Sequence, residues 1–465
     1  MPSPRWSCTR RELATSLMAG AALSLAAACR APSAPTGAKP RSEPVSIVYG
    51  TWYTTMMENL KPYFPQFEEK YNVRLILEIT PTGPGPEGFE AKLVSQLASG
   101  AGPDVMNAQN IVHVKLFDSD VFLDLADRLK RDKIDVKRDY ALMGLEFWCG
   151  KQYAMPFDMG TRAVYYNKTL FKQAGAKDLW DDLQGQWTLD DMLQAALAVT
   201  RVTGDQSDVW GIDMSYTGIP EVNGMYVWTF GGAWADFTTM RYTLDAPPSI
   251  EAHNYIYDLV TKHRVVLPAA ERAAMSRAGI ATPFAAGKVA MWVRASASMG
   301  PVQREVAGRF EWDIAPFPDR TRGRWGVSLV SGNPNEVNRR SAPEKQDAAY
   351  AFVPWLAGPE VQGLFAREKF QVPTLLRMRD AFKTPPPAHA GVFVNLLNYP
   401  YGIHFRHYET EQCNREYSRA MQEVFDSKAG MTETLRALNP RLNQLVQYGS
   451  CYPYAGVTVP VPPAR

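Results

Sequence analysis

From residue 45 onward, short apolar segments alternate with segments that follow the period of a helix. Residues 45–50 alternate in polarity as a half-buried strand does, and residues 73–79 and 105–108 are the next two expected strands. Apolar residues at three- and four-residue steps from Leu60 to Tyr71 predict a helix between the first two. Strands that alternate with helices predict an α/β fold with a largely parallel sheet.

The length of the chain predicts two lobes. It has 465 residues, whereas a single hydrophobic core stops growing at roughly 250–300 residues. The alternation of elements continues in the second part of the chain, where residues 163–167, 289–293 and 312–316 are expected strands. Residues 188–191 (Thr-Leu-Asp-Asp) have the form of a capping box and predict the start of a helix.

The first 44 residues resemble an export signal followed by a tether. Residues 10–13 (Arg-Arg-Glu-Leu) resemble a twin-arginine signal, and an apolar stretch that is too short to span a bilayer follows them. Residues 25–29 (Leu-Ala-Ala-Ala-Cys) resemble a lipobox. We therefore expect residues 1–29 to be a signal peptide with Cys29 as the lipid site; cleavage without lipidation is the alternative. Residues 30–44, rich in Pro, Ala and Ser, predict a flexible tether.

Five cysteines have to be placed. Cys8 would leave with the signal peptide and Cys29 would carry the lipid, which leaves Cys149, Cys413 and Cys451. An exported compartment permits a disulfide, and we expect Cys413 to pair with Cys451. The spacing of the cysteines fits no zinc motif.

Charge and motifs point away from nucleic-acid, cofactor and metal binding. The chain has 50 basic and 48 acidic residues, without the clustered basic excess that nucleic acids require. Residues 83–88 match a dinucleotide-binding pattern, but Pro84 and Pro86 lack the backbone N–H groups that hold a pyrophosphate. His404 and His407 are the one close histidine pair, too few ligands for zinc. No catalytic motif is present, and we expect no cofactor, no metal and no enzyme activity.

Aromatic residues gather where the expected strands end. In open α/β sheets, ligands bind beyond the carboxyl ends of the strands. Indole and phenol rings stack on the C–H faces of sugars, while the sugar hydroxyls need polar partners. Any one of these tryptophans could equally pack in a core. The candidate ligand-binding residues are Trp52, Tyr53, Asp158, Trp228, Trp234, Trp292, Arg294, Trp325 and Gly326.

Several blocks of sequence resemble one family in their order and spacing. The blocks are residues 70–73, 99–105, 153–158, 165–171, 187–191, 284–291, 312–316 and 347–352. The most specific are residues 153–158 (Tyr-Ala-Met-Pro-Phe-Asp) with the following 165–171, and residues 284–291 (Phe-Ala-Ala-Gly-Lys-Val-Ala-Met). Together they resemble the family 1 extracellular solute-binding proteins, over residues 45–440.

The resemblance implies a two-lobed, type II periplasmic-binding-protein-like fold with a ligand cleft between the lobes. The chain would cross the hinge near Asp158 and near Trp325. Lobe 1 would combine residues 45–157 with 288–328, lobe 2 would combine 160–285 with 329–445, and 446–465 would form a C-terminal tail. The protein would bind a sugar or oligosaccharide by lobe closure and deliver it to an ABC permease in the inner membrane. We expect a monomer that is held at the membrane by its lipid anchor alone.

Three alternatives stay open. The ligand could be another solute, such as a glycerol phosphate or a polyamine. Arg162 or Arg294 pointing into the cleft would favour an acidic ligand, and a ring of carboxylates would favour a cationic one. An exported glycoside hydrolase would need two facing carboxylates in the cleft. A binder coupled to a sensor would share the fold with a transport protein.

Overall fold

The computed structural model describes residues 43–81, 88–108, 116–203, 206–217, 221–399, 401–449 and 451. The expected signal peptide, the lipid site Cys29, nearly all of the tether, residues 83–87 of the glycine-proline loop and most of the expected C-terminal tail lie outside the described residues. Within the described part, no helix combines the length and the apolar character that crossing a bilayer requires.

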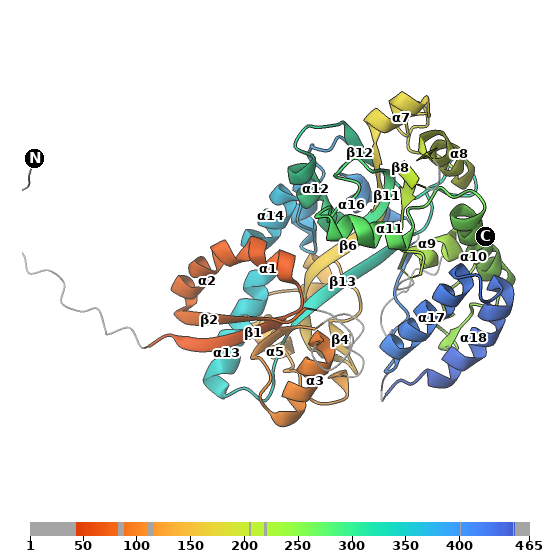
Figure 1. Ribbon diagram of the computed structural model, residues 1–465. Helices are drawn as coiled ribbons and strands as arrows, with labels where there is room; N and C mark the ends of the chain where they lie inside the picture. The colour runs from red at the N-terminus through yellow and green to blue at the C-terminus, as the bar shows by residue number, and fades with distance from the viewer. Residues whose placement is uncertain are drawn as a thin grey trace, which may run out of the picture. The chain divides into compact units, whose positions relative to one another are not determined.

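Strands and helices alternate along the described chain (Figure 1). The strands are β1 (Val45–Thr51), β2 (Val73–Ile79), β3 (Val105–Asn107), β4 (Phe147–Trp148), β5 (Lys151–Gln152), β6 (Ala154–Asn167), β7 (Arg201–Thr203), β8 (Gln206–Asp213), β9 (Ala235–Asp236), β10 (Arg241–Tyr242), β11 (Val289–Ala295), β12 (Trp312–Ala315), β13 (Ser328–Val337), β14 (Val372–Pro373) and β15 (Tyr401–Gly402). The α-helices are α1 (Thr54–Leu60), α2 (Phe64–Tyr71), α3 (Phe89–Ser99), α5 (Ala126–Arg131), α6 (Val136–Asp139), α7 (Lys168–Ala174), α8 (Leu189–Val199), α9 (Glu221–Thr229), α10 (Pro247–Thr261), α11 (Ala269–Arg277), α12 (Met299–Val306), α13 (Pro343–Leu356), α14 (Pro359–Glu368), α15 (Arg379–Phe382), α16 (Val392–Asn395), α17 (Thr410–Phe425) and α18 (Met431–Leu445).

The first strands form the parallel arrangement that their sequence predicts. β1 pairs in parallel with β2 on one side and with β3 on the other, and α1, α2 and α3 lie in the connections. Asn72 ends α2 in a left-handed conformation (φ 52°), which asparagine tolerates better than most residues do. The expected capping box is also present, because Thr188 and Asp191 exchange hydrogen bonds at the start of α8.

Two long strands connect the two ends of the sheet. All 14 residues of β6 are buried, which its mainly apolar sequence allows, and β6 pairs with β13 in antiparallel fashion. β13 also pairs with β3, and β6 pairs with β11 and β12, so the strand order is β2-β1-β3-β13-β6-β11-β8-β7. The long strands β6 and β13 lie side by side in Figure 1. The expected α/β class is confirmed, but the sheet is mixed rather than largely parallel.

Two large hydrophobic clusters lie along this sheet. One joins residues 47–157 with 337–375, and the other joins residues 143–330 with 403–442. This grouping differs from the expected lobes: strands β11 and β12, within 288–328, pack with the second cluster because both pair with β6. The chain passes between the clusters within β6 and β13 and again after Leu375. The exact lobe boundaries stay a prediction.

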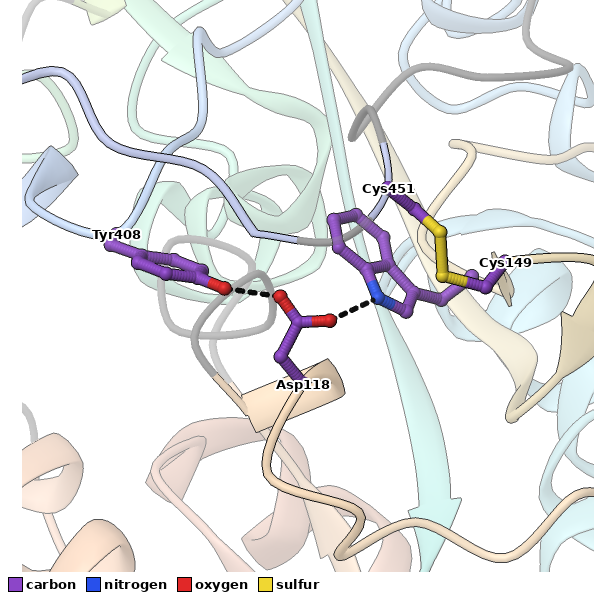
Figure 2. The surroundings of a disulfide bond; sticks show 5 residues. Asp118, Cys149, Tyr408 and Cys451 are labelled. Carbon is purple, nitrogen blue, oxygen red and sulfur yellow. Dashed lines mark hydrogen bonds between the residues drawn. A yellow bond between two sulfur atoms is a disulfide. The ribbon is translucent and has the colours of Figure 1, made fainter.

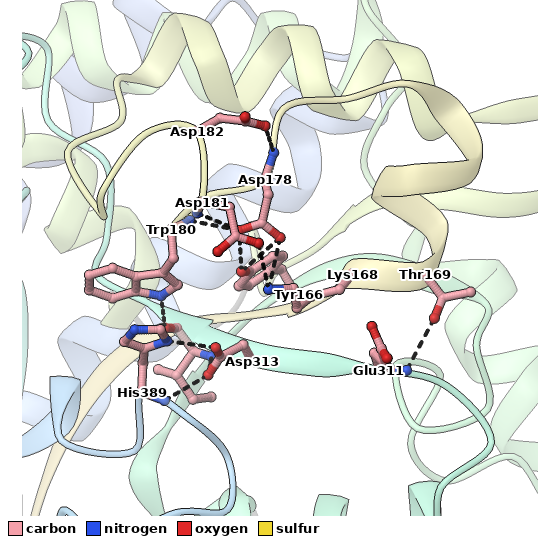
Figure 3. Close-up of polar contacts among 11 residues, drawn as sticks. Tyr166, Lys168, Thr169, Asp178, Trp180, Asp181, Asp182, Glu311, Asp313 and His389 are labelled. Atoms are coloured by element: carbon pink, nitrogen blue, oxygen red, sulfur yellow. Dashed lines mark hydrogen bonds and ion pairs between the residues drawn. The ribbon is translucent and has the colours of Figure 1, made fainter.

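A network of contacts around Asp313 and His389 holds the segment before α16 against β12 (Figure 3). The carboxylate of Asp313 accepts a hydrogen bond from the backbone N–H of His389 at 2.9 Å and lies 2.6 Å from Nδ1 of the same residue. The indole of Trp180 stacks on the His389 ring, with 3.9 Å between the ring centroids. Further along, the carbonyl of Phe393 accepts a hydrogen bond from the Thr161 hydroxyl at 2.7 Å. These contacts hold β6 in place near its middle.

The disulfide joins Cys149 to Cys451, so the expected Cys413–Cys451 pair is wrong. Cys413 is buried on α17, where its sulfur lies 3.9 Å from the Leu442 carbonyl of α18, whereas Cys451 follows α18 and reaches the β4–β5 hairpin. Figure 2 shows a second contact beside this disulfide. Asp118 accepts hydrogen bonds from the Trp148 indole at 2.9 Å and from the Tyr408 hydroxyl.

We predict that Cys451→Ser lowers the free energy of unfolding by about 2–5 kcal/mol, because the disulfide closes a long loop in the unfolded chain. The two cysteines are 302 positions apart in the sequence. Denaturant titrations with and without a reducing agent measure the loss, and reduction should have little further effect on the variant. Cys413→Ala is the control: because it retains the disulfide, a reducing agent should still lower its stability. Alkylation of both Cys149 and Cys451 in the unreduced protein, detected by mass spectrometry, would contradict the pairing.

Candidate ligand-binding site

A cavity of about 510 Å³ lies where both hydrophobic clusters contribute to the wall. One side comes from the chain after β1 and from the middle of β6 and β13, and the other from β8, α11 and β11. The residues that line it are Trp52, Tyr53, Asp158, Arg162, Asp213, Met214, Ser215, Val222, Arg272, Trp292, Val293, Arg294, Ala295, Ala297, Ser298, Ser331, Asn333, Gln371 and His404. The wall thus combines three large aromatic rings with charged and amide side chains.

Trp52 and Tyr53 form a flat aromatic surface after β1. Their rings stack with 4.5 Å between centroids and an angle of 4° between planes. The indole Nε1 of Trp52 is buried and has no hydrogen-bond partner among the described residues. Burial raises the pKa of the Tyr53 hydroxyl and the nearby Asp158 raises it further, so this hydroxyl stays a neutral donor and acceptor.

Asp158 is a buried carboxyl group in the middle of β6. Its Oδ1 accepts hydrogen bonds from the backbone N–H of Asn333 at 2.9 Å and from Nδ2 of the same residue at 3.1 Å. The ladder between β6 and β13 shifts register between Asn333 and Pro334, where proline cannot donate a ladder bond, and this irregularity accompanies the side-chain pairing. The Oδ2 of Asp158 and the Oδ1 of Asn333 are buried without a partner among the described residues.

Burial raises the pKa of Asp158 to about 7, although the two hydrogen bonds from Asn333 lower it. Only 2% of the residue is exposed, so water does little to stabilise its charge. Near neutral pH this carboxyl group therefore exists in both protonation states, and it can accept or donate a hydrogen bond at Oδ2.

Three arginines line the same cavity. Arg272 binds Asp213 in an ion pair, with 2.5 Å from Nη1 to Oδ2. Arg162 donates to the Ser331 hydroxyl at 3.5 Å. Arg294 is exposed, and its guanidinium lies 5.4 Å from the centroid of the Trp292 ring. Burial lowers the pKa of Arg272 to about 10, and the positive charge of Arg294 lowers it as well.

Five of the nine candidate residues line the cavity: Trp52, Tyr53, Asp158, Trp292 and Arg294. The other four candidates lie elsewhere in the molecule. Trp228 and Trp234 belong to the hydrophobic core, Trp228 against Gly402 and Trp234 edge-on to Tyr417. Trp325 stacks on Tyr399 at 4.6 Å, and Gly326 lies so close to the Pro318 carbonyl that no side chain would fit.

The candidate residues chosen from the sequence omitted several polar residues of the wall. Asp213 ends β8, a position that the strand-end rule could have selected. Asn333 lies inside β13 and Arg272 on α11, where no local pattern indicates a ligand site. His404 lines the cavity, whereas His407 is buried with its Nε2 3.0 Å from the Tyr242 hydroxyl. Among the described residues, no group of three potential metal ligands converges.

An α/β fold with an aromatic and polar cavity between two clusters defines a ligand-binding protein of the two-lobed, type II class. A family model described as "Bacterial extracellular solute-binding protein" matches residues 51–363, and the chain belongs to this family. No curated protein matches the chain by sequence. The family resemblance that the sequence blocks indicate is thereby confirmed.

Solved structures share the fold. The ABC substrate-binding protein Lmo0181 from Listeria monocytogenes, in complex with cycloalternan, has a TM-score of 0.74 at 18% identity over 86% of this chain and 99% of its own. The maltose/maltodextrin-binding domain MalE from Bdellovibrio bacteriovorus, bound to maltotriose, has a TM-score of 0.71 at 17% identity, over 86% and 99%. UgpB from Mycobacterium tuberculosis, in complex with glycerophosphocholine, has a TM-score of 0.71 at 20% identity, over 87% and 98%.

We predict that Asp158→Asn stabilises the protein above pH 7. The pKa of Asp158 is about 7 in the folded state and about 3.9 in an unfolded chain. Between these values the folded state holds more protons, so the free energy of unfolding decreases as pH rises from about 4 to 7. Asparagine removes this loss, on the order of 2–4 kcal/mol at pH 8, and has no such advantage near pH 4.

Urea unfolding at pH 4.5 and pH 8 measures this difference. Asp178→Asn serves as a control of opposite sign. Burial acts to raise the pKa of Asp178, but hydrogen bonds from Asp181, Trp180 and Lys168 outweigh it and lower the pKa (Figure 3). That variant should therefore lose stability at pH 8. Equal stability of Asp158→Asn and the unsubstituted protein at both pH values would show that burial does not hold this carboxyl group protonated.

Proposed function

We propose that this protein captures a sugar or an oligosaccharide for an ABC importer. The observation that carries the proposal is the composition of the cavity wall in a chain of this family: stacked aromatic rings beside buried hydrogen-bonding atoms that lack partners. Aromatic faces bind the C–H faces of a sugar ring, and the polar atoms pair with its hydroxyls. Complexes of neighbours with cycloalternan and maltotriose support the same ligand class.

Three buried polar atoms of the wall that lack partners among the described residues can each form a hydrogen bond with a hydroxyl group. Trp52 offers a donor, Asn333 offers an acceptor, and Asp158 offers an oxygen whose proton depends on pH. A hydroxyl both donates and accepts, so it can satisfy any of the three. A buried polar atom without a hydrogen-bond partner destabilises the protein, and a ligand that supplies the partner removes this cost, which favours binding.

The proposed mechanism is closure of two lobes around the ligand. Trp52 and Asp158 belong to the part of the wall near β1 and β13, whereas Arg272 and Trp292 belong to the part near β8 and β11. A ligand that contacts both parts in the closed form would favour that form, because only closure brings all the contacts together. The closed form would then be the one that the permease accepts.

We further propose that the protein is exported and lipid-anchored through Cys29 and works as a monomer outside the cytoplasm. The twin-arginine and lipobox patterns support export and anchoring. A glycoside hydrolase is less well supported, because one of the two carboxylates of the wall, Asp213, is bound in an ion pair with Arg272. A polyamine is disfavoured, because the part of the wall that the structure describes holds two carboxyl groups, Asp158 and Asp213, rather than a ring of them.

A carbohydrate ligand at 100 times its dissociation constant should stabilise the protein by about 2.7 kcal/mol, measurable as a rise in melting temperature. Trp52→Ala should weaken binding by about tenfold or more, because it removes half of the stacked surface. Trp325→Ala, a tryptophan outside the cavity that also stacks on a tyrosine, should keep the affinity within about twofold. Titration calorimetry with a panel of mono- and oligosaccharides tests both variants. Stabilisation by a non-carbohydrate alone would overturn the sugar assignment.

A further inference from the structure

The geometry of the cavity points to a sugar that carries an acidic group, a carboxylate or a phosphate, which Arg294 binds with help from Arg162. This inference rests on the proposed function and adds the chemical class of the ligand to it. Its basis is the charge of the wall, the position of Arg294 and the arrangement of the three guanidinium groups, none of which entered the argument for a sugar.

The wall carries a positive excess. Among the described residues, three arginines line the cavity, Arg162, Arg272 and Arg294, against two carboxyl groups, Asp158 and Asp213, and this part of the wall holds no lysine and no glutamate. With both carboxyl groups ionised, the balance is 3 − 2 = +1. The protonated fraction of Asp158 near neutral pH raises this excess further. A neutral sugar would leave the positive charge uncompensated inside a partly enclosed site, where it costs more than in open water.

Arg294 is placed to receive an anion. On β11 it follows Trp292 by two residues, so both side chains lie on the same face of the strand. Its guanidinium lies over the Trp292 ring, a cation–π arrangement that orients the group and leaves N–H donors for a ligand. Within the described part of the chain, no carboxylate lies within ion-pair distance of Arg294. Arg272, by contrast, already binds Asp213.

The three guanidinium groups act on the same small region. Arg294 and Arg162 both lower the pKa of the Tyr53 hydroxyl, against the larger effect of burial. Arg294 also lowers the pKa of Arg272 through repulsion between the two positive groups. An oxyanion placed between them would replace this repulsion by charge-assisted hydrogen bonds, which guanidinium groups form with carboxylates and phosphates alike.

Matched pairs of ligands test the inference, because each pair differs only in the acidic group. The pairs are D-galacturonate with D-galactose, D-glucuronate with D-glucose, glucose 6-phosphate with glucose, and glycerol 3-phosphate with glycerol. Titration calorimetry should show at least one acidic member bound about tenfold or more tightly than its neutral partner. Its affinity should fall as sodium chloride rises from 50 to 500 mM, because salt screens the attraction. The two uronate pairs and the two phosphate pairs show whether the site prefers a carboxylate or a phosphate.

Arg294→Gln should weaken binding of the acidic ligand by about 10- to 100-fold and weaken binding of its neutral partner by much less, so that the difference between the two ligands narrows. Arg294→Lys should recover part of the loss, because it keeps the charge but not the two parallel hydrogen bonds. The matched control is Arg320→Gln. Arg320 also lies over an aromatic ring, that of Phe230, but it is paired with Glu251 outside the cavity. The control should bind every ligand as the unsubstituted protein does.

The outcomes separate this inference from the proposed function. Neutral sugars that bind as tightly as their acidic partners, with no effect of Arg294→Gln, would overturn the acidic ligand and leave the sugar-binding function standing. Binding of glycerol 3-phosphate without binding of any sugar would support the anion site and overturn the sugar assignment. A panel in which no acidic member binds more tightly than its neutral partner overturns the inference.

Discussion

The site depends on the antiparallel pairing of β6 with β13. These two strands carry the chain between the hydrophobic clusters, and the pairing runs from Ala154 opposite Glu336 to Thr161 opposite Val330. Its register shift after Asn333 is accompanied by two hydrogen bonds from Asn333 to the Asp158 carboxylate. The shift leaves Phe157 without a partner across the ladder and places Pro334 opposite Pro156, so neither residue of that pair has an N–H to donate. The same pair of strands therefore connects the two hydrophobic clusters and places Asp158 and Asn333 in the cavity wall.

The elements that local periodicity specifies were predictable, whereas their partners were not. Exposure alternates from Val73 to Leu77, as in a strand with one buried face, and β2 has the predicted bounds 73–79. β11 and β12 both pair with β6, a contact across more than a hundred residues that no local pattern encodes, and the expected lobe boundaries stay a prediction. The predicted disulfide pair was wrong for a related reason, since Cys149 and Cys451 are 302 positions apart in sequence and no local pattern indicates that they meet.

Aromatic residues were a useful but incomplete guide to the site. Trp52 directly follows β1, as the prediction from strand ends required, and it lines the cavity. Trp292 also lines the cavity, but it lies inside β11, which continues to Ala295 beyond the expected end of the strand at 293. Trp228 and Trp234 have the same composition around them, but α9 and the following turn face the core, where burial of an indole gains more free energy than exposure at a cavity wall. The charge excess of the cavity could not be read from a chain whose net charge is +2, because it results from three arginines on three different elements.

The Cys149–Cys451 disulfide limits how the two parts of the wall can move. The chain already passes between the hydrophobic clusters three times, and the disulfide adds a covalent link between the β4–β5 hairpin and the segment after α18. The hydrogen bond from Tyr408 to Asp118 lies beside it and joins the same two regions (Figure 2). Any closing motion has to keep the Cα atoms of the two cysteines close to their 5.6 Å separation. The proposed closure would therefore have to move the two parts of the wall while this linked side of the molecule stays together.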